Sequence, residues 1–132
     1  MSKINPTDRK YSKDHEWIRV DGEGTAWLGI TDHAQEMLTD IVFVELPEIG
    51  RKIRAGEAVA VIESVKSVSD VYSPIGGEVI EVNRLLENAP EQINRDAFGA
   101  GWIARLKRID TTDLNFLMSA EEYEKTLTET VR

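Results

Sequence analysis

The stretch AVAVIESVKSVSDVYSPIGGEVIEVN, residues 58–83, contains the clearest strand pattern in the chain. Ala58–Ile62 and Val68–Tyr72 are short runs rich in β-branched residues, a composition typical of strands. Residues 73–77, SPIGG, are a strong turn signal. Lys66 lies midway between the two runs, so the sequence predicts that this lysine is near the tip of a β-hairpin.

The same alternation of short apolar runs and turn residues continues on both sides of this stretch. We predict further strands at Glu16–Val20, Thr25–Gly29, Ile41–Leu46, Glu78–Asn83 and Trp102–Lys107. The residues between the first two, DGEG, tolerate the backbone conformations of a hairpin turn. Many short strands, interrupted by glycine and proline, predict a mostly β protein built as a small barrel or sandwich.

Two helices are predicted outside the strands. Thr31–Leu38 fits a two-turn helix whose first residue, a threonine, is a suitable N-cap. The sequence SAEE at residues 119–122 is a capping box, which predicts a helix from Ala120 to about Thr130. Tyr123 and Leu127 are four residues apart and would share the face that packs against the β-structure.

Length and composition limit the class of protein. The 132 residues suffice for one hydrophobic core, so we expect a single domain, 1–132, with a core at about 11–108 and a helical segment at about 111–130. The net charge of -8 repels phosphates, so neither nucleic acid nor a membrane is an expected partner. The absence of cysteine excludes disulfides and thiolate metal sites. No signal or transit peptide pattern is present, which predicts a cytoplasmic protein or a mature organellar form.

Lys66 is the candidate for covalent modification. A lysine at a hairpin tip projects its primary amine into solvent on a flexible stem. An enzyme that reads the rigid turn can acylate this amine, and a long acyl group then becomes a tethered reactant for partner enzymes. Most exposed lysines only add solubility. The position alone therefore does not decide the role of Lys66, and the surrounding residues do.

The segment ESVKSVSDVYSP, residues 63–74, with Gly77-Glu78-Val79 after it, closely resembles the lipoyl-attachment segment of glycine cleavage H proteins. Four more blocks resemble that family in the same order: YSKDHEWI at 11–18, GITDHAQ at 29–35, DIVFVELPEIG at 40–50 and NRDAFGAGW at 94–102. The resemblance extends from about Tyr11 to Tyr123. It implies a lipoyl-type barrel-sandwich hybrid with a short internal helix and a C-terminal helix.

The resemblance implies a carrier rather than an enzyme, without catalytic residues and with lipoate covalently bound to Lys66. Such a carrier takes an aminomethyl group from the pyridoxal-phosphate glycine decarboxylase (P protein) to the tetrahydrofolate-dependent aminomethyltransferase (T protein). Dihydrolipoamide dehydrogenase (L protein) then reoxidises it, and a lipoate ligase or lipoyl transferase attaches the cofactor. The demanding chemistry belongs to the enzymes' cofactors, and the carrier supplies position and protection.

Protection matters because an aminomethyl group on sulfur hydrolyses readily, and relatives are thought to fold the loaded arm into a surface cleft. On this resemblance Asp14, Glu16 and Asp70 are candidate contacts for the cationic amino group. A solvated acidic residue or a turn cap is the alternative interpretation of each, and for Asp14 it is at least as good. Some relatives have a histidine where this chain has Met37, so the lining of the cleft differs here.

The remaining candidate residues favour structural roles. His15 and His33 lack further ligands at metal spacing, so we expect structural histidines and no metal site. Trp17, Trp27 and Trp102 are expected to pack in the core or at the edge of a cleft.

Other functions fit parts of this pattern. Lipoyl domains of 2-oxoacid dehydrogenase complexes resemble the lysine segment, but they favour Asp-Lys-Ala where this chain has Val65-Lys66-Ser67. Biotin carriers usually place methionines beside the lysine. A hydrolase that uses Glu16 and Asp70 as an acid–base pair would need a deep pocket, which the sequence does not indicate. A lipoyl relay, which hands lipoyl groups to other carriers, is compatible with the carrier function.

Overall fold

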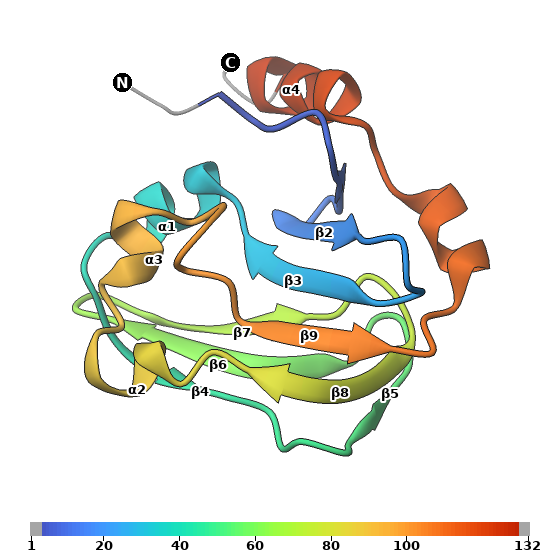
Figure 1. Cartoon of the computed structure of the whole chain (residues 1–132). Helices are drawn as coiled ribbons and strands as arrows, with labels where there is room; N and C mark the ends of the chain where they lie inside the picture. The colour runs from blue at the N-terminus through green and yellow to red at the C-terminus, as the bar shows by residue number, and fades with distance from the viewer. Residues whose placement is uncertain (1–3, 130–132) are drawn as a thin grey trace.

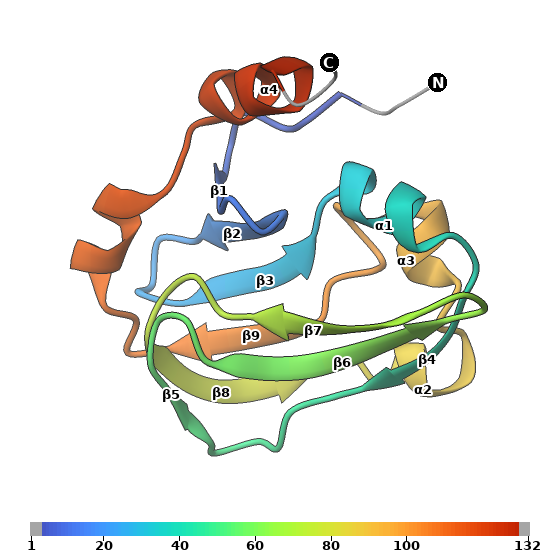
Figure 2. The same ribbon diagram turned by 180° about the vertical axis from the view of Figure 1, so that it is seen from behind.

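The computed structural model describes residues 4–129 and contains two antiparallel sheets. The larger sheet has the strand order β1-β2-β3-β9-β8-β5, and the smaller has the order β4-β6-β7. The strands of the larger sheet are β1 (Lys10–Tyr11), β2 (Glu16–Val20), β3 (Ala26–Ile30), β5 (Lys52–Ile53), β8 (Gly77–Val82) and β9 (Ala104–Lys107). Those of the smaller sheet are β4 (Ile41–Glu45), β6 (Ala58–Ser64) and β7 (Val68–Tyr72). Figures 1 and 2 show the smaller sheet lying against β8 and β9, so the predicted mostly β class is confirmed as a two-sheet sandwich.

Helices lie at the ends of the strands and above the larger sheet (Figure 1). They are α1 (Asp32–Leu38), α2 (Leu85–Asn88), α3 (Gln92–Arg95), a 3-10 helix at Thr111–Phe116 and α4 (Ala120–Glu129). Both predicted helix starts are confirmed, because the Thr31 hydroxyl accepts a hydrogen bond from the Ala34 amide and the Ser119–Glu122 capping box is formed. Among the described helices, none has the length and apolar character needed to cross a bilayer.

The predicted boundaries needed several corrections. β3 begins and ends one residue later than expected, β6 continues two residues further to Ser64, and β9 begins at Ala104 rather than Trp102. The two-residue strands β1 and β5 and the one-turn helices α2 and α3 were not predicted. Elements this short carry no measurable hydrophobic period, so pairing partners and tertiary packing decide whether they form.

The main core fills the space between the two sheets. Its fully buried members include Ile18 and Leu28 from the larger sheet, Ile62 from the smaller sheet, and Ile75 from the turn that joins them. Burying one such side chain stabilises the fold by roughly 1.5–3 kcal/mol. This core holds the β6–β7 hairpin against the rest of the molecule.

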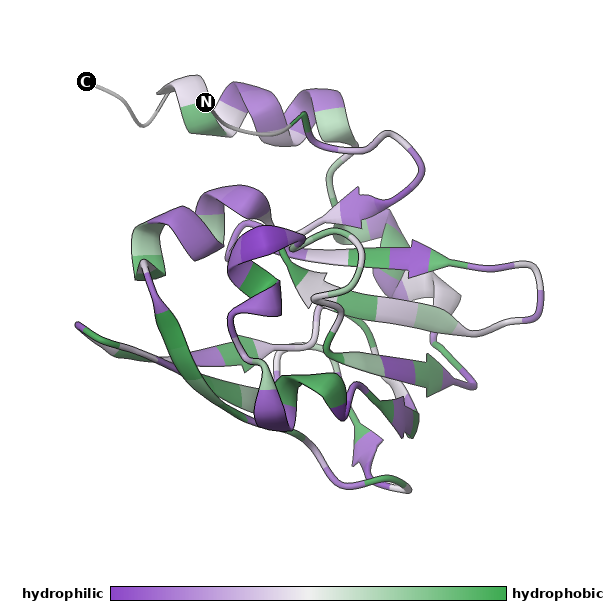
Figure 3. Cartoon of the chain, turned by 60° about the vertical axis from the view of Figure 1, so that its left-hand side comes forward, coloured by the Kyte–Doolittle hydropathy of each residue, from purple (hydrophilic) through white to green (hydrophobic). Residues whose placement is uncertain are grey.

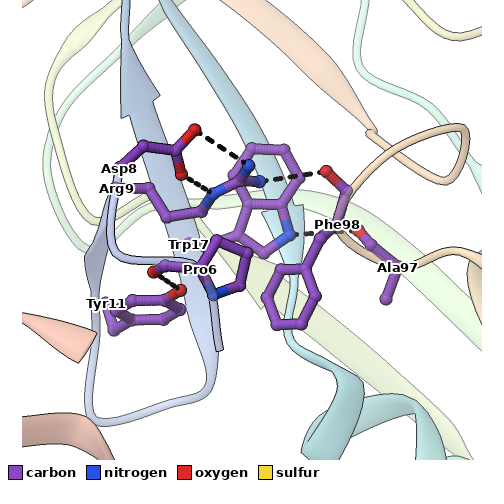
Figure 4. Close-up of polar contacts among 7 residues, drawn as sticks. All are labelled: Pro6, Asp8, Arg9, Tyr11, Trp17, Ala97 and Phe98. Carbon is purple, nitrogen blue, oxygen red and sulfur yellow. Dashed lines mark hydrogen bonds and ion pairs between the residues drawn. The ribbon is translucent and has the colours of Figure 1, made fainter. Parts of the chain in front are cut away.

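A second, smaller cluster lies on the other face of β2, where Trp17 is 1% exposed. The Arg9 guanidinium stacks 4.6 Å from the Trp17 ring centroid and donates to the Phe98 carbonyl, while the indole N–H donates to the Ala97 carbonyl (Figure 4). Tyr11 from this cluster stacks on Tyr123 of α4. β2 is therefore covered by the main core on one face and by this cluster on the other. The cluster packs the N-terminal segment and α4 against β2.

The C-terminal helix α4 is largely hydrophilic, with few hydrophobic residues along it (Figure 3). Tyr123 is fully buried and Leu127 is partly buried, as their shared helical face predicts. They pack on the second cluster, and not on the core between the sheets. Gly29 in β3 makes room for this cluster, since a Cβ there would lie 2.5 Å from the Trp17 ring.

Candidate functional site

The tip of the β6–β7 hairpin is residues 64–67, and the predicted position of Lys66 at this tip is confirmed. The Ser64 amide donates to the Ser67 carbonyl at 2.8 Å and closes the turn. The buried Ser64 hydroxyl oxygen accepts from the amides of Lys66 at 3.3 Å and Ser67 at 3.1 Å. Val65 N donates to the Asp40 carbonyl at 3.0 Å, which fastens the tip to the residue before β4. The backbone of the turn is therefore well defined.

The side chains that follow Ser64, at residues 65–68, are exposed to solvent. Val65 and Val68, on either side, are 67% and 63% exposed, and Lys66 is exposed as well. None of the ion pairs within residues 4–129 includes Lys66. Figures 1 and 2 show the hairpin extending past the ends of the neighbouring strands. The amine of Lys66 is thus accessible to an enzyme that approaches along the hairpin.

A surface cleft of about 480 Å³ begins beside Lys66 and runs along β7. This volume is within the range of small-molecule sites, roughly 300–1,000 Å³. Its walls come from the turn before β2, from β3, α1, β6 and β7. The residues that line it are Lys13, Asp14, His15, Glu16, Ile30, Ala34, Met37, Leu38, Ile62, Ser67, Val68, Ser69, Asp70, Val71 and Tyr72.

The three carboxylates singled out from the sequence all line this cleft. Asp14 and Asp70 are exposed, on the turn before β2 and on β7 respectively. Met37 of α1 is 50% exposed and also belongs to the lining. The cleft therefore combines apolar walls with acidic groups, and Lys13 is the basic residue on its rim.

Glu16 differs from the other two acids because it is 3% exposed and bonded on both oxygens. Oε1 accepts from the Ser12 hydroxyl at 2.5 Å, and Oε2 accepts from the Tyr72 amide of β7 at 3.1 Å. Burial raises the pKa of the Glu16 carboxyl to about 7, although both hydrogen bonds oppose that shift. Near neutral pH this carboxyl is divided between its protonated and ionised forms.

Reasoning from the sequence missed three partners of this cleft: the Ser12 hydroxyl, the Tyr72 amide and the His15 ring. His15 Nδ1 lies 2.7 Å from the Tyr123 hydroxyl of α4, and the ring centroids of His15 and His33 are 4.8 Å apart. Burial and the neighbouring His33 lower the pKa of His15. The contacts through Tyr72 and His15 join segments that are distant in sequence and leave no local signal. The four-residue spacing of Ser12 and Glu16 is the one sequence feature that could have indicated a contact.

A metal centre has no support in the part of the chain that the structure describes, where no group of three or more histidine or acidic side chains could hold an ion. Glu16 and His15 of the cleft bond to Ser12, the Tyr72 amide and the Tyr123 hydroxyl instead. The arrangement suits a flexible arm that starts at Lys66 and carries a small cation.

The chain matches known proteins over nearly its whole length. Residues 9–130 match the family model described as "Glycine cleavage H-protein". The "Glycine cleavage system H protein" of Pseudoalteromonas translucida is 54% identical over 129 residues, which cover 98% of this chain and 99% of that protein. The protein of the same name from Thermus thermophilus is 54% identical over 92% of this chain and 94% of its own length.

A solved structure agrees with these relatives. The crystal structure of a glycine cleavage system H protein from Mycobacterium marinum superposes with a TM-score of 0.86 at 40% identity, covering 94% of this chain and 99% of that one. The likeness therefore covers nearly the whole chain and is not limited to the lysine segment. These matches do not favour the alternative of a 2-oxoacid dehydrogenase lipoyl domain.

Proposed function

Because the chain belongs to the glycine cleavage H-protein family, we propose that it is the lipoyl-bearing shuttle of glycine cleavage, with lipoate attached to Lys66 as an amide. The observation that carries the assignment of Lys66 is the rigid hairpin tip from which this lysine extends without an ion pair among the described residues. When bound, lipoate supplies a disulfide that accepts the aminomethyl group and can be reoxidised afterwards. The chain is then a carrier and a substrate of other enzymes rather than an enzyme.

The partners follow from this role. The carrier would receive the aminomethyl group at the P protein, deliver it to the T protein and be reoxidised by the L protein, after a lipoate ligase or lipoyl transferase has modified it. We take the whole chain, 1–132, as one lipoyl-carrier domain, with its core at about 11–108 and its helical segment at about 111–130. The hairpin's exposed valines offer each partner the same apolar surface beside the reactive arm.

We propose that the cleft beside β7 protects the loaded arm. Asp14, Glu16 and Asp70 line this cleft and would hold the cationic amino group. A cation that arrives near Glu16 favours the ionised carboxylate and lowers its pKa from about 7. Because Glu16 is buried, its interaction with a cation is less screened than that of the exposed Asp14 and Asp70.

An acid–base hydrolase built on Glu16 and Asp70 is the weaker proposal. Both oxygens of Glu16 already accept hydrogen bonds, from Ser12 and from the Tyr72 amide. Because Glu16 is 3% exposed and both oxygens are already bonded, it lacks the open contact with a water molecule that an acid–base catalyst needs.

The assignment of Lys66 is tested by Lys66→Arg, which keeps the charge and removes the primary amine that can be acylated. Purified protein is incubated with lipoate, ATP and a lipoate ligase, and the intact mass is measured. The variant should fold normally and gain no mass, while Lys52→Arg, a change at an exposed lysine of β5, should be modified like the wild type. Lipoylated Lys66→Arg would contradict the assignment.

The protecting cleft is tested separately. Wild type, Asp70→Asn and Glu16→Gln are lipoylated, loaded with the aminomethyl group and freed of the other enzymes, and the adduct is followed by mass spectrometry. A partly screened charge pair is worth on the order of 1 kcal/mol, so each change should accelerate loss severalfold. Glu48→Gln, at an exposed site outside the cleft lining, is the control. Equal decay in all four proteins would remove Glu16 and Asp70 from the site.

A further inference from the structure

One hydroxyl group connects the C-terminal helix to the arm cleft. Tyr123 of α4 is fully buried, and its hydroxyl lies 2.7 Å from His15 Nδ1 and 2.7 Å from the Thr31 hydroxyl. His15 belongs to the cleft lining and stands between Asp14 and Glu16 in the chain. The segment around Tyr123 is held in place by a two-way backbone bridge between Tyr11 and Met118.

The hydrogen bonds through this hydroxyl have one satisfactory direction. The Ala34 amide donates to the Thr31 oxygen as the N-cap bond of α1. If Thr31 then donates to Tyr123, and Tyr123 donates to His15 Nδ1, each hydroxyl hydrogen has an acceptor. In the opposite direction the hydroxyl hydrogen of the fully buried Thr31 finds no acceptor among the bonds of residues 4–129, which is costly in an interior.

This direction specifies the chemical state of His15. Nδ1 must be an unprotonated acceptor, so the neutral ring carries its proton on Nε2. A neutral ring agrees with the lowered pKa of His15, which results from burial and from His33. A protonated ring would instead place a donor at Nδ1 and break the chain of bonds.

The backbone at His15 needs such support. Its φ is 70°, in the left-handed region that non-glycine residues occupy only when surrounding contacts hold them there. The His15 amide donates to the Ser12 carbonyl at 3.2 Å, and its carbonyl accepts from the Thr31 amide at 2.9 Å. The bond from Tyr123 is the third contact, and it acts on the ring.

We propose that Tyr123 is a positioning residue for the arm cleft: its hydroxyl fixes the tautomer and orientation of His15 and thereby holds the turn that presents Asp14 and Glu16. The consequence for the loaded arm rests on the proposed function, whereas the effect on His15 does not. The C-terminal helix is then part of the carrier's working site, although none of its described residues lines the cleft directly.

Tyr11 supplies a matched control. Its ring stacks on Tyr123 with centroids 4.9 Å apart, it is equally buried, and its hydroxyl donates to the Pro6 carbonyl (Figure 4). Tyr11→Phe and Tyr123→Phe each remove one buried hydroxyl from the same cluster. Only Tyr123→Phe removes a contact with the cleft.

The first experiment uses protein without lipoate. Nitrogen-15 NMR of the His15 ring at pH 8 should show the proton on Nε2 in the wild type and in Tyr11→Phe. Tyr123→Phe should give a mixture of tautomers and shifted amide signals at residues 12–16. A wild-type ring protonated on Nδ1 would overturn the proposal even if Tyr123→Phe failed to fold. An unchanged tautomer in a folded Tyr123→Phe would overturn it as well.

The second experiment follows decay of the aminomethyl adduct on lipoylated protein. Tyr123→Phe should lose the adduct severalfold faster than the wild type and Tyr11→Phe. A protected wild type with equally slow decay in Tyr123→Phe would overturn this inference and leave the proposed function intact. Wild-type decay as fast as that of a small-molecule aminomethyl dihydrolipoamide would count against the protecting cleft itself, and the ring NMR would still decide the role of Tyr123.

Discussion

The hairpin tips of β2–β3 and β6–β7 lie at opposite ends of the sandwich and are built from the same local chemistry (Figures 1 and 2). At residues 21–25, Asp21 accepts a hydrogen bond from the Glu23 amide two residues later. At residues 64–67, Ser64 accepts from the Lys66 amide in the same relation. In both tips a short polar side chain caps the turn that follows it.

The two tips differ in whether their charged side chain has a partner. Asp21 is bonded inward, accepting from the Thr25 hydroxyl and pairing with Arg105 of β9 at 3.1 Å. Lys66 has no such pair among the described residues and stands between two exposed valines. A capped hairpin tip is therefore a structural device that this fold uses twice. A reactive site needs, in addition, a charged group that the fold leaves available.

The largest effect is expected from moving the lysine between the tips. In the double variant Lys66→Arg with Glu23→Lys, the new lysine is exposed on a capped turn but lacks the residues of the 63–70 segment. We expect no lipoylation at residue 23, because the ligase must read the shape of the turn and not exposure alone. Intact mass after incubation with ligase, lipoate and ATP is the measurement.

The single variant Glu23→Lys is the control for this transplant, since it keeps Lys66 and should gain one lipoyl group. Two lipoyl groups on that control, or one on the double variant, would show that exposure at a hairpin tip is sufficient.

A smaller effect is expected from Ser64→Ala, which removes the oxygen that caps the Lys66 and Ser67 amides. Losing a side-chain cap of this kind costs about 1 kcal/mol, and the loosened tip should be lipoylated severalfold more slowly. Ser69→Ala is the matched control, because the Ser69 hydroxyl has one long bond, 3.4 Å, to the Asp70 carbonyl. The measurements are the initial rate of lipoylation and amide exchange at residues 66 and 67. Equal rates in both variants would mean that the ligase does not need the cap.

The β6–β7 hairpin was predictable because its signals are local. The runs around Lys66, the turn at residues 73–77 and the capping box at residues 119–122 each lie within a few residues of sequence. The hairpin from β2 to β3 was found for the same reason, within one residue. Pairing between distant strands, such as β3 with β9, leaves no such local mark.

The three candidate carboxylates line one cleft, and the geometry of this cleft was not predictable from the sequence. Lys66, Asp14 and Asp70 are exposed. Glu16 was expected at the cleft, but its burial and its bonds to Ser12 and the Tyr72 amide depend on how β7 crosses β2 in space. The role of α4 behind the cleft likewise depends on tertiary packing.

Two carboxyls of the β2–β3 hairpin, at opposite ends of β2, have shifted pKa values, and the shifts have opposite signs. The pKa of Glu16, which contacts β7, is raised from 4.5 to about 7. The stability that comes from this raised pKa is fully present below pH 4.5 and is lost as the pH rises through 7. Glu16→Gln replaces the carboxyl by a neutral group of similar shape. Its free energy of unfolding should therefore rise relative to that of the wild type between pH 5 and pH 8, by on the order of 2–3 kcal/mol.

Urea denaturation at several pH values measures this difference, with Glu48→Gln as the exposed control. If the difference in free energy of unfolding between Glu16→Gln and the wild type does not change with pH, Glu16 is ionised in the folded protein over the whole range from pH 5 to pH 8.

The smallest effect is expected at the other end of β2, in the tip of the β2–β3 hairpin. Bonds from the Thr25 hydroxyl and the Glu23 amide, with Arg105 nearby, lower the pKa of Asp21 from 3.8 to about 2. Its contribution to stability is therefore present above pH 3.8 and is lost as the pH falls through 2. Asp21→Asn should melt a few degrees below the wild type at pH 7, and this difference should shrink from pH 4 downward. Glu23→Gln, at the same tip, is the control and should have the melting temperature of the wild type at each pH. Lipoylation should be unchanged in both variants, since this tip contributes no group to the arm. A melting difference that stays constant down to pH 2 would mean that the shape of the side chain, and not its charge, holds the β2–β3 tip.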